Sequence, residues 1–169
     1  MTIVVAPLHG VENAIRTWRP SHVVSLGSPG AASAAIPEEL ERLQLTFHDI
    51  VELTDGLSPM TEAQMAELLA FGAAWPRTAP LLVHCWAGVS RSPAAAYVLA
   101  CMIHEDRSPD QLARRLRQVA PWATPNRRMV GLADQALSRD GAMLSAIAGI
   151  GRGAETAWGN TFCLDPRSG

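Results

Sequence analysis

The chain has no lysine: its 14 Lys+Arg positions are all arginine, and 16 acidic residues leave a formal net charge of -2 at pH 7. Proteins that bind nucleic acid need a basic surface, because contacts with the phosphate backbone supply most of the affinity. The slight excess of acidic residues therefore argues against a nucleic-acid partner, and we expect none.

Long apolar runs are also absent. Hydrophobic residues make up 48% of the chain, but the longest runs, such as residues 94–103, fall well short of the roughly 20 apolar residues of a membrane-spanning helix. Residues 1–8 lack the basic start and the long apolar stretch of a secretory signal. We therefore expect a soluble, cytoplasmic protein without a membrane partner.

Cysteine is scarce, with only Cys85, Cys101 and Cys163 among 169 residues. These well-separated cysteines form neither a paired disulfide framework nor the close Cys/His clusters that hold zinc. We therefore expect no metal and no cofactor. Cys101 lies inside an apolar run, where a cysteine is usually a buried small hydrophobe.

What the sequence does contain is an alternation of short apolar runs with helical patterns. The spacing predicts a helix at 11–18 and strands at 3–6, 22–26, 43–49 and 81–84. This alternation is typical of a single α/β domain, with a central, mostly parallel sheet of about four to five strands flanked by helices on both faces. We expect one compact catalytic domain at 1–150 and a glycine-rich tail at 151–169 that is packed or disordered.

Four helix starts are predicted by a hydroxyl residue that can cap the first turn, followed by a proline. The pairs are Ser58-Pro59, Ser92-Pro93, Ser108-Pro109 and Thr124-Pro125. The last two helices carry arginines, at positions 114, 115, 117, 127 and 128. These arginines either form a solvated face or steer an acidic substrate.

The segment that carries the chemistry is residues 84–93, HCWAGVSRSP, which joins a buried strand to a helix at the carboxyl edge of the predicted sheet. Backbone N–H groups of such a loop can turn inward, Gly88 permits a conformation closed to other residues, and the helix amino terminus adds partial positive charge. A phosphate dianion fits this environment. The candidate phosphate-binding residues are Cys85, Trp86, Ala87, Gly88, Val89, Ser90 and Arg91.

Cys85 and Arg91 are the candidate nucleophile and phosphate clamp. An adjacent arginine and a helix amino terminus stabilise a cysteine thiolate, which is the nucleophilic form. We therefore expect Cys85 to be ionised at neutral pH. Arg91 offers a planar fork of donors that can hold two phosphate oxygens at once, a geometry that lysine lacks.

This pattern of His-Cys, five residues and Arg-Ser resembles the signature loop of the cysteine-based protein tyrosine phosphatase superfamily, in particular its compact bacterial tyrosine and dual-specificity members. The resemblance implies a two-step reaction in which the cysteine takes the phosphoryl group and water then hydrolyses the phosphocysteine. It also implies that the Ser92 hydroxyl assists breakdown of that intermediate and that His84 helps to order the loop by hydrogen bonding.

The resemblance further implies a general acid, an aspartate upstream of the cysteine, and the chain offers Asp49 and Asp55. We favour Asp49, because it ends a predicted strand at the sheet edge where ligand sites gather, and because the sequence Phe-His-Asp there resembles the Phe-x-Asp arrangement of some members. Asp55 stays open as the alternative, since its spacing to Cys85 suits compact dual-specificity enzymes. Asn126 resembles the Pro-Asn element that some members place behind the loop as support.

The expected function is a phosphomonoester hydrolase that acts through a phosphocysteine intermediate. The apolar loop residues Trp86, Ala87 and Val89 favour phosphotyrosine, and hence a protein tyrosine phosphatase acting on a phosphorylated protein or a small phosphoester. A dual-specificity or small-molecule phosphatase is the alternative within this class. A non-catalytic phosphate-recognition module is the alternative from another class, although such a module would normally have replaced the cysteine, the arginine or the acid. The oligomeric state is left open.

Overall fold

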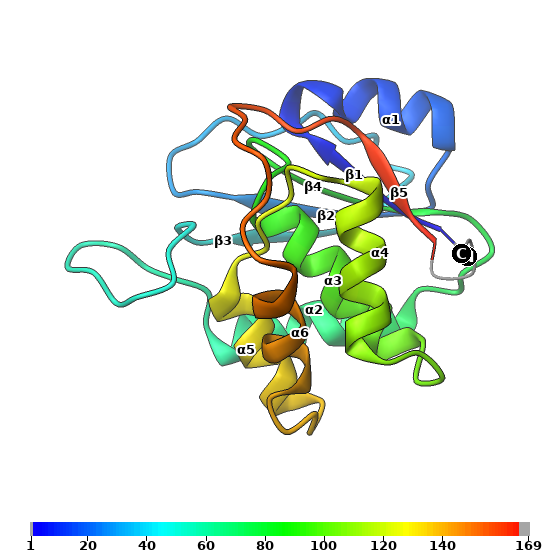
Figure 1. Cartoon of the computed structure of the whole chain (residues 1–169). Helices are drawn as coiled ribbons and strands as arrows, with labels where there is room; N and C mark the ends of the chain where they lie inside the picture. The colour runs from blue at the N-terminus through cyan, green and yellow to red at the C-terminus, as the bar shows by residue number, and fades with distance from the viewer. Residues whose placement is uncertain (1, 166–169) are drawn as a thin grey trace.

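The computed structural model describes residues 2–165, and within them the chain forms a five-stranded sheet with the strand order β3-β2-β4-β1-β5 (Figure 1). Its strands are β1 (Ile3–Pro7), β2 (His22–Gly27), β3 (Glu41–Thr46), β4 (Leu81–Cys85) and β5 (Phe162–Leu164). The first four strands pair in parallel, whereas β5 runs antiparallel to β1. The predicted α/β class with a mostly parallel sheet is confirmed.

Helices cover both faces of this sheet, as predicted (Figure 1). α1 (Val11–Trp18), preceded by the 3-10 turn η1 (Leu8–Gly10), lies on one face. The other face carries a helical layer made of α2 (Glu62–Ala74), α3 (Arg91–Ile103), α4 (Pro109–Val119), α5 (Arg127–Ala136) and α6 (Ala142–Ile150). Among residues 2–165, none of these helices has the length and apolar character needed to span a bilayer.

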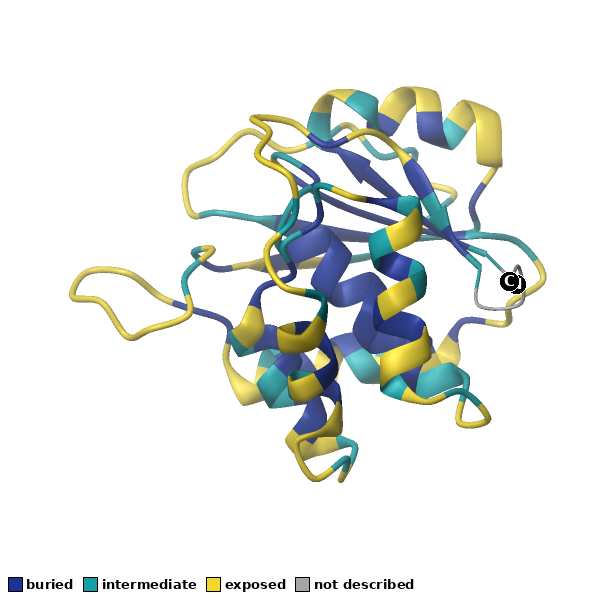
Figure 2. Ribbon diagram, in the orientation of Figure 1, coloured by how far each residue is buried: buried dark blue, intermediate teal, exposed yellow. Residues whose placement is uncertain are grey.

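α3 is the centre of the helical layer. Its residues from Arg91 to Cys101 are all buried, and the helix appears as a dark-blue ribbon inside the molecule (Figure 2). A helix that is apolar on all sides is stable only when other elements surround it, and α2, α4 and α5 pack around α3 on the sheet. This burial fixes Arg91, the first residue of α3, beside the carboxyl end of β4.

Only one of the four predicted helix starts is confirmed. α4 begins after the cap Ser108, whose hydroxyl accepts a hydrogen bond from the Gln111 N–H group at 3.2 Å. α2 begins after Thr61 and not at Ser58. Thr61 forms a reciprocal capping box with Gln64, which satisfies two amide groups at once, so the prediction at Ser58 is wrong.

The predicted starts at Ser92 and Thr124 are wrong as well. α3 already begins at Arg91, so Ser92 lies inside its first turn. α5 begins after Asn126, whose side chain accepts a hydrogen bond from the Met129 N–H group at 3.1 Å. Asparagine caps a helix at least as well as threonine. Because Asn126 is the cap, α5 begins at Arg127, later than the Thr124-Pro125 pair predicts.

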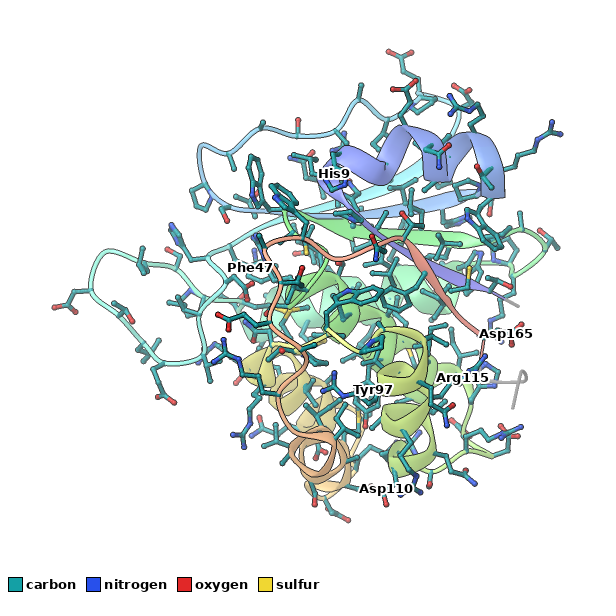
Figure 3. The ribbon with its side chains drawn as sticks, turned by 45° about the horizontal axis from the view of Figure 1, so that its top comes forward. His9, Phe47, Tyr97, Asp110, Arg115 and Asp165 are labelled. Atoms are coloured by element: carbon teal, nitrogen blue, oxygen red, sulfur yellow. The ribbon has the colours of Figure 1, made fainter. Side chains whose placement is uncertain are left out.

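The glycine-rich tail contributes β5 to the sheet. β5 pairs with β1 and aligns Cys163 with Val4, and the segment before it crosses the end of the molecule where the parallel strands finish (Figure 1). Because β5 is antiparallel, Asp165 lies at the opposite end of the sheet from Phe47, which follows β3 (Figure 3). The domain boundary at 150 stays a prediction, and residues 166–169 of the tail lie outside the described residues.

Candidate active site

The loop between β4 and α3 turns its backbone carbonyls outward. Backbone N–H groups from surrounding segments donate to them, namely Leu8 to Trp86 O at 3.0 Å, Gly159 to Ala87 O at 2.8 Å, Thr124 to Val89 O at 2.8 Å and Asn126 to Ser90 O at 3.3 Å. With the carbonyls held outside, the N–H groups of the loop are free to face its interior. Such a ring of inward N–H groups binds anions.

Gly88 is required at its position for two reasons. Its φ is +70°, in the left-handed region that other residues adopt only at a cost. A Cβ atom there would also lie 3.0 Å from the Pro7 nitrogen at the end of β1. The Gly88 N–H group donates to Cys85 Sγ at 3.3 Å, so the glycine orients its amide into the loop.

Cys85, the last residue of β4, places its sulfur inside this loop. Sγ accepts the hydrogen bond from Gly88 and lies 3.0 Å from Ser92 Oγ. The amino terminus of α3, which carries a partial positive charge, begins at the end of the same loop. The structure thus brings the predicted nucleophile and Ser92 together.

The other two thiols have different surroundings. Cys101 is buried in α3, and burial raises its pKa to about 12. Burial also raises the pKa of Cys163, in β5, to about 11. Both residues are therefore protonated thiols at neutral pH, and neither lies in the signature loop.

Arg91 is held by one amino group and leaves another edge of its guanidinium unused. Nη1 donates to Ser28 Oγ at 3.0 Å and to the Phe47 carbonyl oxygen at 3.1 Å. Nε is buried and has no hydrogen-bond partner among residues 2–165; it lies 3.7 Å from Asp49 Oδ2. Buried donors without partners are rare, and a phosphate oxygen would supply one here.

Asp49 lies at the rim of the same loop. Its Oδ1 atom accepts hydrogen bonds from Ser90 Oγ at 2.8 Å and from Asn126 Nδ2 at 2.7 Å. Asn126 therefore positions the carboxylate and caps α5 at the same time. The sequence indicates Asp49, Asn126 and the signature loop as three separate features. The structure brings them into direct contact.

Asp55 stands apart from this arrangement. It is exposed, within the loop that projects from the body between β3 and α2 (Figure 1). In the part of the chain that the structure describes, its carboxylate makes no hydrogen bond or ion pair. The geometry therefore favours Asp49 over Asp55 as the group beside a bound phosphate.

His84 is buried behind the loop in a chain of polar side chains. Its Nε2 atom lies 2.8 Å from Ser25 Oγ, which accepts a further hydrogen bond from Arg42 Nε at 3.1 Å. Burial, with a smaller contribution from Arg42, lowers the pKa of His84 from 6.5 to about 4. His84 is therefore neutral at pH 7 and contributes a fixed hydrogen bond at the end of β4.

Sequence reasoning misses three residues that shape this site: Ser25, Ser28 and Gly159. Ser25 lies near the carboxyl end of β2 and Ser28 just follows that strand, a position where ligand sites of α/β proteins gather, and this signal could have found them. Gly159 has no such signal, because its contact with the loop depends on how the tail folds back. Beside it, Trp158 packs against Trp86 with ring centroids 5.6 Å apart.

Several solved structures resemble this one. The Yvh1 phosphatase domain from Chaetomium thermophilum gives a TM-score of 0.59 at 17% identity, covering 83% of this chain and 93% of that one. Human DUSP28 gives 0.59 at 20% identity, with 82% and 94% covered, and DUSP15 gives 0.61 at 13% identity, with 87% and 90% covered. The chain has the fold of the dual-specificity phosphatases.

This phosphatase fold is not visible in sequence comparisons. No protein-family model matches the chain, and no curated protein matches it. The dual-specificity phosphatase fold is therefore identified from tertiary structure. The contacts around Cys85, Arg91 and Asp49 indicate the chemistry that the site can perform.

Proposed function

We propose that this protein is a phosphomonoester hydrolase of the protein tyrosine phosphatase type, which acts in the cytoplasm through a phosphocysteine intermediate. The observation that carries the proposal is the loop around Cys85: the carbonyls of Trp86, Ala87, Val89 and Ser90 accept hydrogen bonds from surrounding segments, while the buried Nε of Arg91 has no hydrogen-bond partner among residues 2–165. A phosphate dianion would meet the inward N–H groups and the unused guanidinium edge together.

In the first step, Cys85 Sγ attacks phosphorus, and the bond between phosphorus and the leaving oxygen breaks as the S–P bond forms. Asp49 donates its proton to that oxygen. Asp49 is in place for this transfer, because Ser90 and Asn126 hold its carboxyl group at the rim of the loop, 3.7 Å from Arg91 Nε. The loop N–H groups and Arg91 stabilise the charge on the equatorial oxygens.

In the second step, water attacks the phosphorus of the phosphocysteine. Asp49, now a carboxylate, accepts a proton from the water, and the S–P bond breaks to release inorganic phosphate and the Cys85 thiolate. The Ser92 hydroxyl, 3.0 Å from Sγ, donates a hydrogen bond to the departing sulfur. His84 keeps the end of β4 in place through Ser25.

Phosphotyrosine is the substrate that the rim of the loop suits best. Trp86 is 47% exposed and lies beside the exposed Trp158, and such rings offer an apolar surface to a phenyl group. A dual-specificity or small-molecule phosphatase remains the alternative within the class. A non-catalytic recognition module is less consistent with the site, because binding alone requires neither a nucleophile nor Asp49 held at the rim.

The test is to assay phosphotyrosine, phosphoserine and small phosphoester substrates with the wild type, Cys85→Ser and Cys163→Ser. We expect Cys85→Ser to lose turnover but still bind vanadate or phosphate, because the serine hydroxyl keeps the shape of the loop and does not ionise near neutral pH. Cys163→Ser, outside the loop, should retain activity. Substantial hydrolysis by Cys85→Ser would exclude the cysteine mechanism.

A further inference from the structure

A second concave surface lies directly beside the signature loop. It is a groove of about 430 Å³, and we call it the arginine groove. Val89 of the loop lines it, together with Pro125 and Arg127 at the start of α5 and Ile147 and Arg152 around the end of α6. The groove therefore borders the signature loop at Val89, and the proposed catalytic cycle leaves it unused.

Hydrogen bonds fix the arginine groove relative to the loop. The Thr124 N–H group donates to Val89 O at 2.8 Å, and Thr124 Oγ1 accepts a hydrogen bond from the Gly153 N–H group at 3.1 Å. Arg117 donates to the Gly151 carbonyl oxygen at 2.7 Å, so this arginine is a structural clamp and not part of a solvated face. A ligand in the groove would hence lie at a defined distance from the reacting phosphate.

The two arginines of the groove are free to bind an anion. Both Arg127 and Arg152 are exposed, and neither has an ion pair or side-chain hydrogen bond within residues 2–165. Other arginines of the same layer are engaged: Arg114 lies 3.6 Å from Asp110, and Arg128 donates to the Met60 carbonyl oxygen. An anion between Arg127 and Arg152 would be held from two sides.

Arg127 also stands where a cation is unfavourable for the fold. It is the first residue of α5, whose first turn contains no acidic side chain. A positive charge at a helix amino terminus opposes the helix dipole at a cost of a few tenths of a kcal/mol or more. Local helix stability therefore does not account for this arginine, whereas an anionic ligand does.

We propose that the arginine groove binds an acidic side chain next to the phosphorylated residue, so that the preferred substrates are acidic phosphopeptides. This inference rests on the proposed phosphatase function. The apolar groove residues Val89, Pro125 and Ile147 suit the aliphatic stem of a glutamate, and Arg127 and Arg152 suit its carboxylate. A small phosphoester would fill the signature loop alone, whereas a peptide can occupy both sites.

The test compares phosphotyrosine peptides that differ only in whether the flanking residues are Glu, Gln or Lys. Two readouts are used: kcat/KM of the wild type, and Kd for the Cys85→Ser protein, which needs no turnover. We expect the Glu peptide to be favoured over the Gln peptide by about 3- to 10-fold, the effect of one or two exposed ion pairs. The preference should fall as salt is raised.

Variants assign the preference to the groove. Arg127→Ala and Arg152→Ala should each bring the Glu-to-Gln ratio towards 1, and Arg152→Glu should shift the preference to the Lys peptide. Arg114→Ala removes a charge outside the groove and should leave the ratio unchanged. An unchanged ratio in Arg127→Ala and Arg152→Ala would overturn the inference.

The two proposals can fail separately. Absence of turnover, with the Glu preference still present in the Kd values and still dependent on Arg127 and Arg152, would reject the phosphatase and keep the groove. Turnover without any Glu preference would reject the groove and keep the phosphatase. If Arg127 and Arg152 instead selected small bisphosphates over acidic peptides, the peptide assignment would be wrong.

Discussion

Hydrogen bonds hold Asp49 at the signature loop, whereas none among residues 2–165 holds Asp55 there. This difference decides which of the two aspartates can act at the loop. Both are exposed residues of the segment that joins β3 to α2. Asp49 follows the end of β3 closely and bonds to Ser90 and Asn126, whereas Asp55 lies in the projecting part of the segment. A side chain close to a strand end is held by the sheet, and this positioning is what a general acid needs.

We expect Asp49→Asn to slow hydrolysis of phenyl and alkyl phosphates by ~10²–10⁴-fold, because general acid catalysis contributes about this much. Substrates such as p-nitrophenyl phosphate, whose leaving group departs readily without a proton, should lose much less. The measurement is kcat for both kinds of substrate in Asp49→Asn and in the matched control Asp55→Asn. A selective loss in the control instead would move the acid to Asp55.

At the scale of elements, the signature loop is shaped by three segments that bond to its carbonyls from outside. They are the turn after β1, the segment before α5 and the tail before β5, represented by Leu8, Asn126 and Gly159. The loop sequence supplies Gly88 and the reactive groups. The surrounding elements determine which way its peptide groups face, because each outward carbonyl has a partner only in the folded chain.

Gly88→Ala should therefore disturb activity more than an ordinary glycine substitution. We expect kcat/KM to fall by roughly 10- to 100-fold, because the Cβ atom would press on the Pro7 nitrogen and shift the inward N–H groups. Gly141→Ala is the matched control: its φ is +83° but nothing lies within 4 Å of the added atom. It should lose about 1–2 kcal/mol of stability and retain activity, and equal activity losses in both variants would contradict the prediction.

At the scale of the whole molecule, folding buries His84 in its neutral form. Its pKa is about 4 in the folded protein and 6.5 otherwise. Below pH 6.5 the unfolded chain therefore binds a proton that the folded chain does not, and stability is lost as the pH falls towards 4. Nδ1 of His84 has no hydrogen-bond partner among residues 2–165, so the fold offers no acceptor to a charged imidazole.

The wild type should consequently lose about 2 kcal/mol more of its unfolding free energy between pH 7 and pH 5 than His84→Gln, because glutamine does not titrate. Urea unfolding at several pH values measures this difference. The range above pH 5 is chosen because most carboxylates are ionised throughout it. Parallel pH dependences in the two proteins would show that His84 is not held neutral.

The sequence by itself determined the α/β class and the signature loop, and it named Cys85 and Arg91 as the candidate reactive pair. These follow from neighbouring residues, since a strand, a glycine-containing turn and a helix start within residues 84–93 set their own geometry. The cap at Ser108 was equally local. The caps Thr61 and Asn126 were not predicted, because several polar residues near each start compete and side-chain contacts choose between them.

Only the tertiary structure decided which distant groups meet the loop. Asp49 was favoured from sequence, but its bonds to Ser90 and Asn126 join segments far apart in the chain. Ser28 and Gly159 likewise reach the site because the parallel strands end at one edge and the tail crosses it. Such contacts depend on how helices and strands pack, and packing is set by the burial of the whole core and not by any local run of residues.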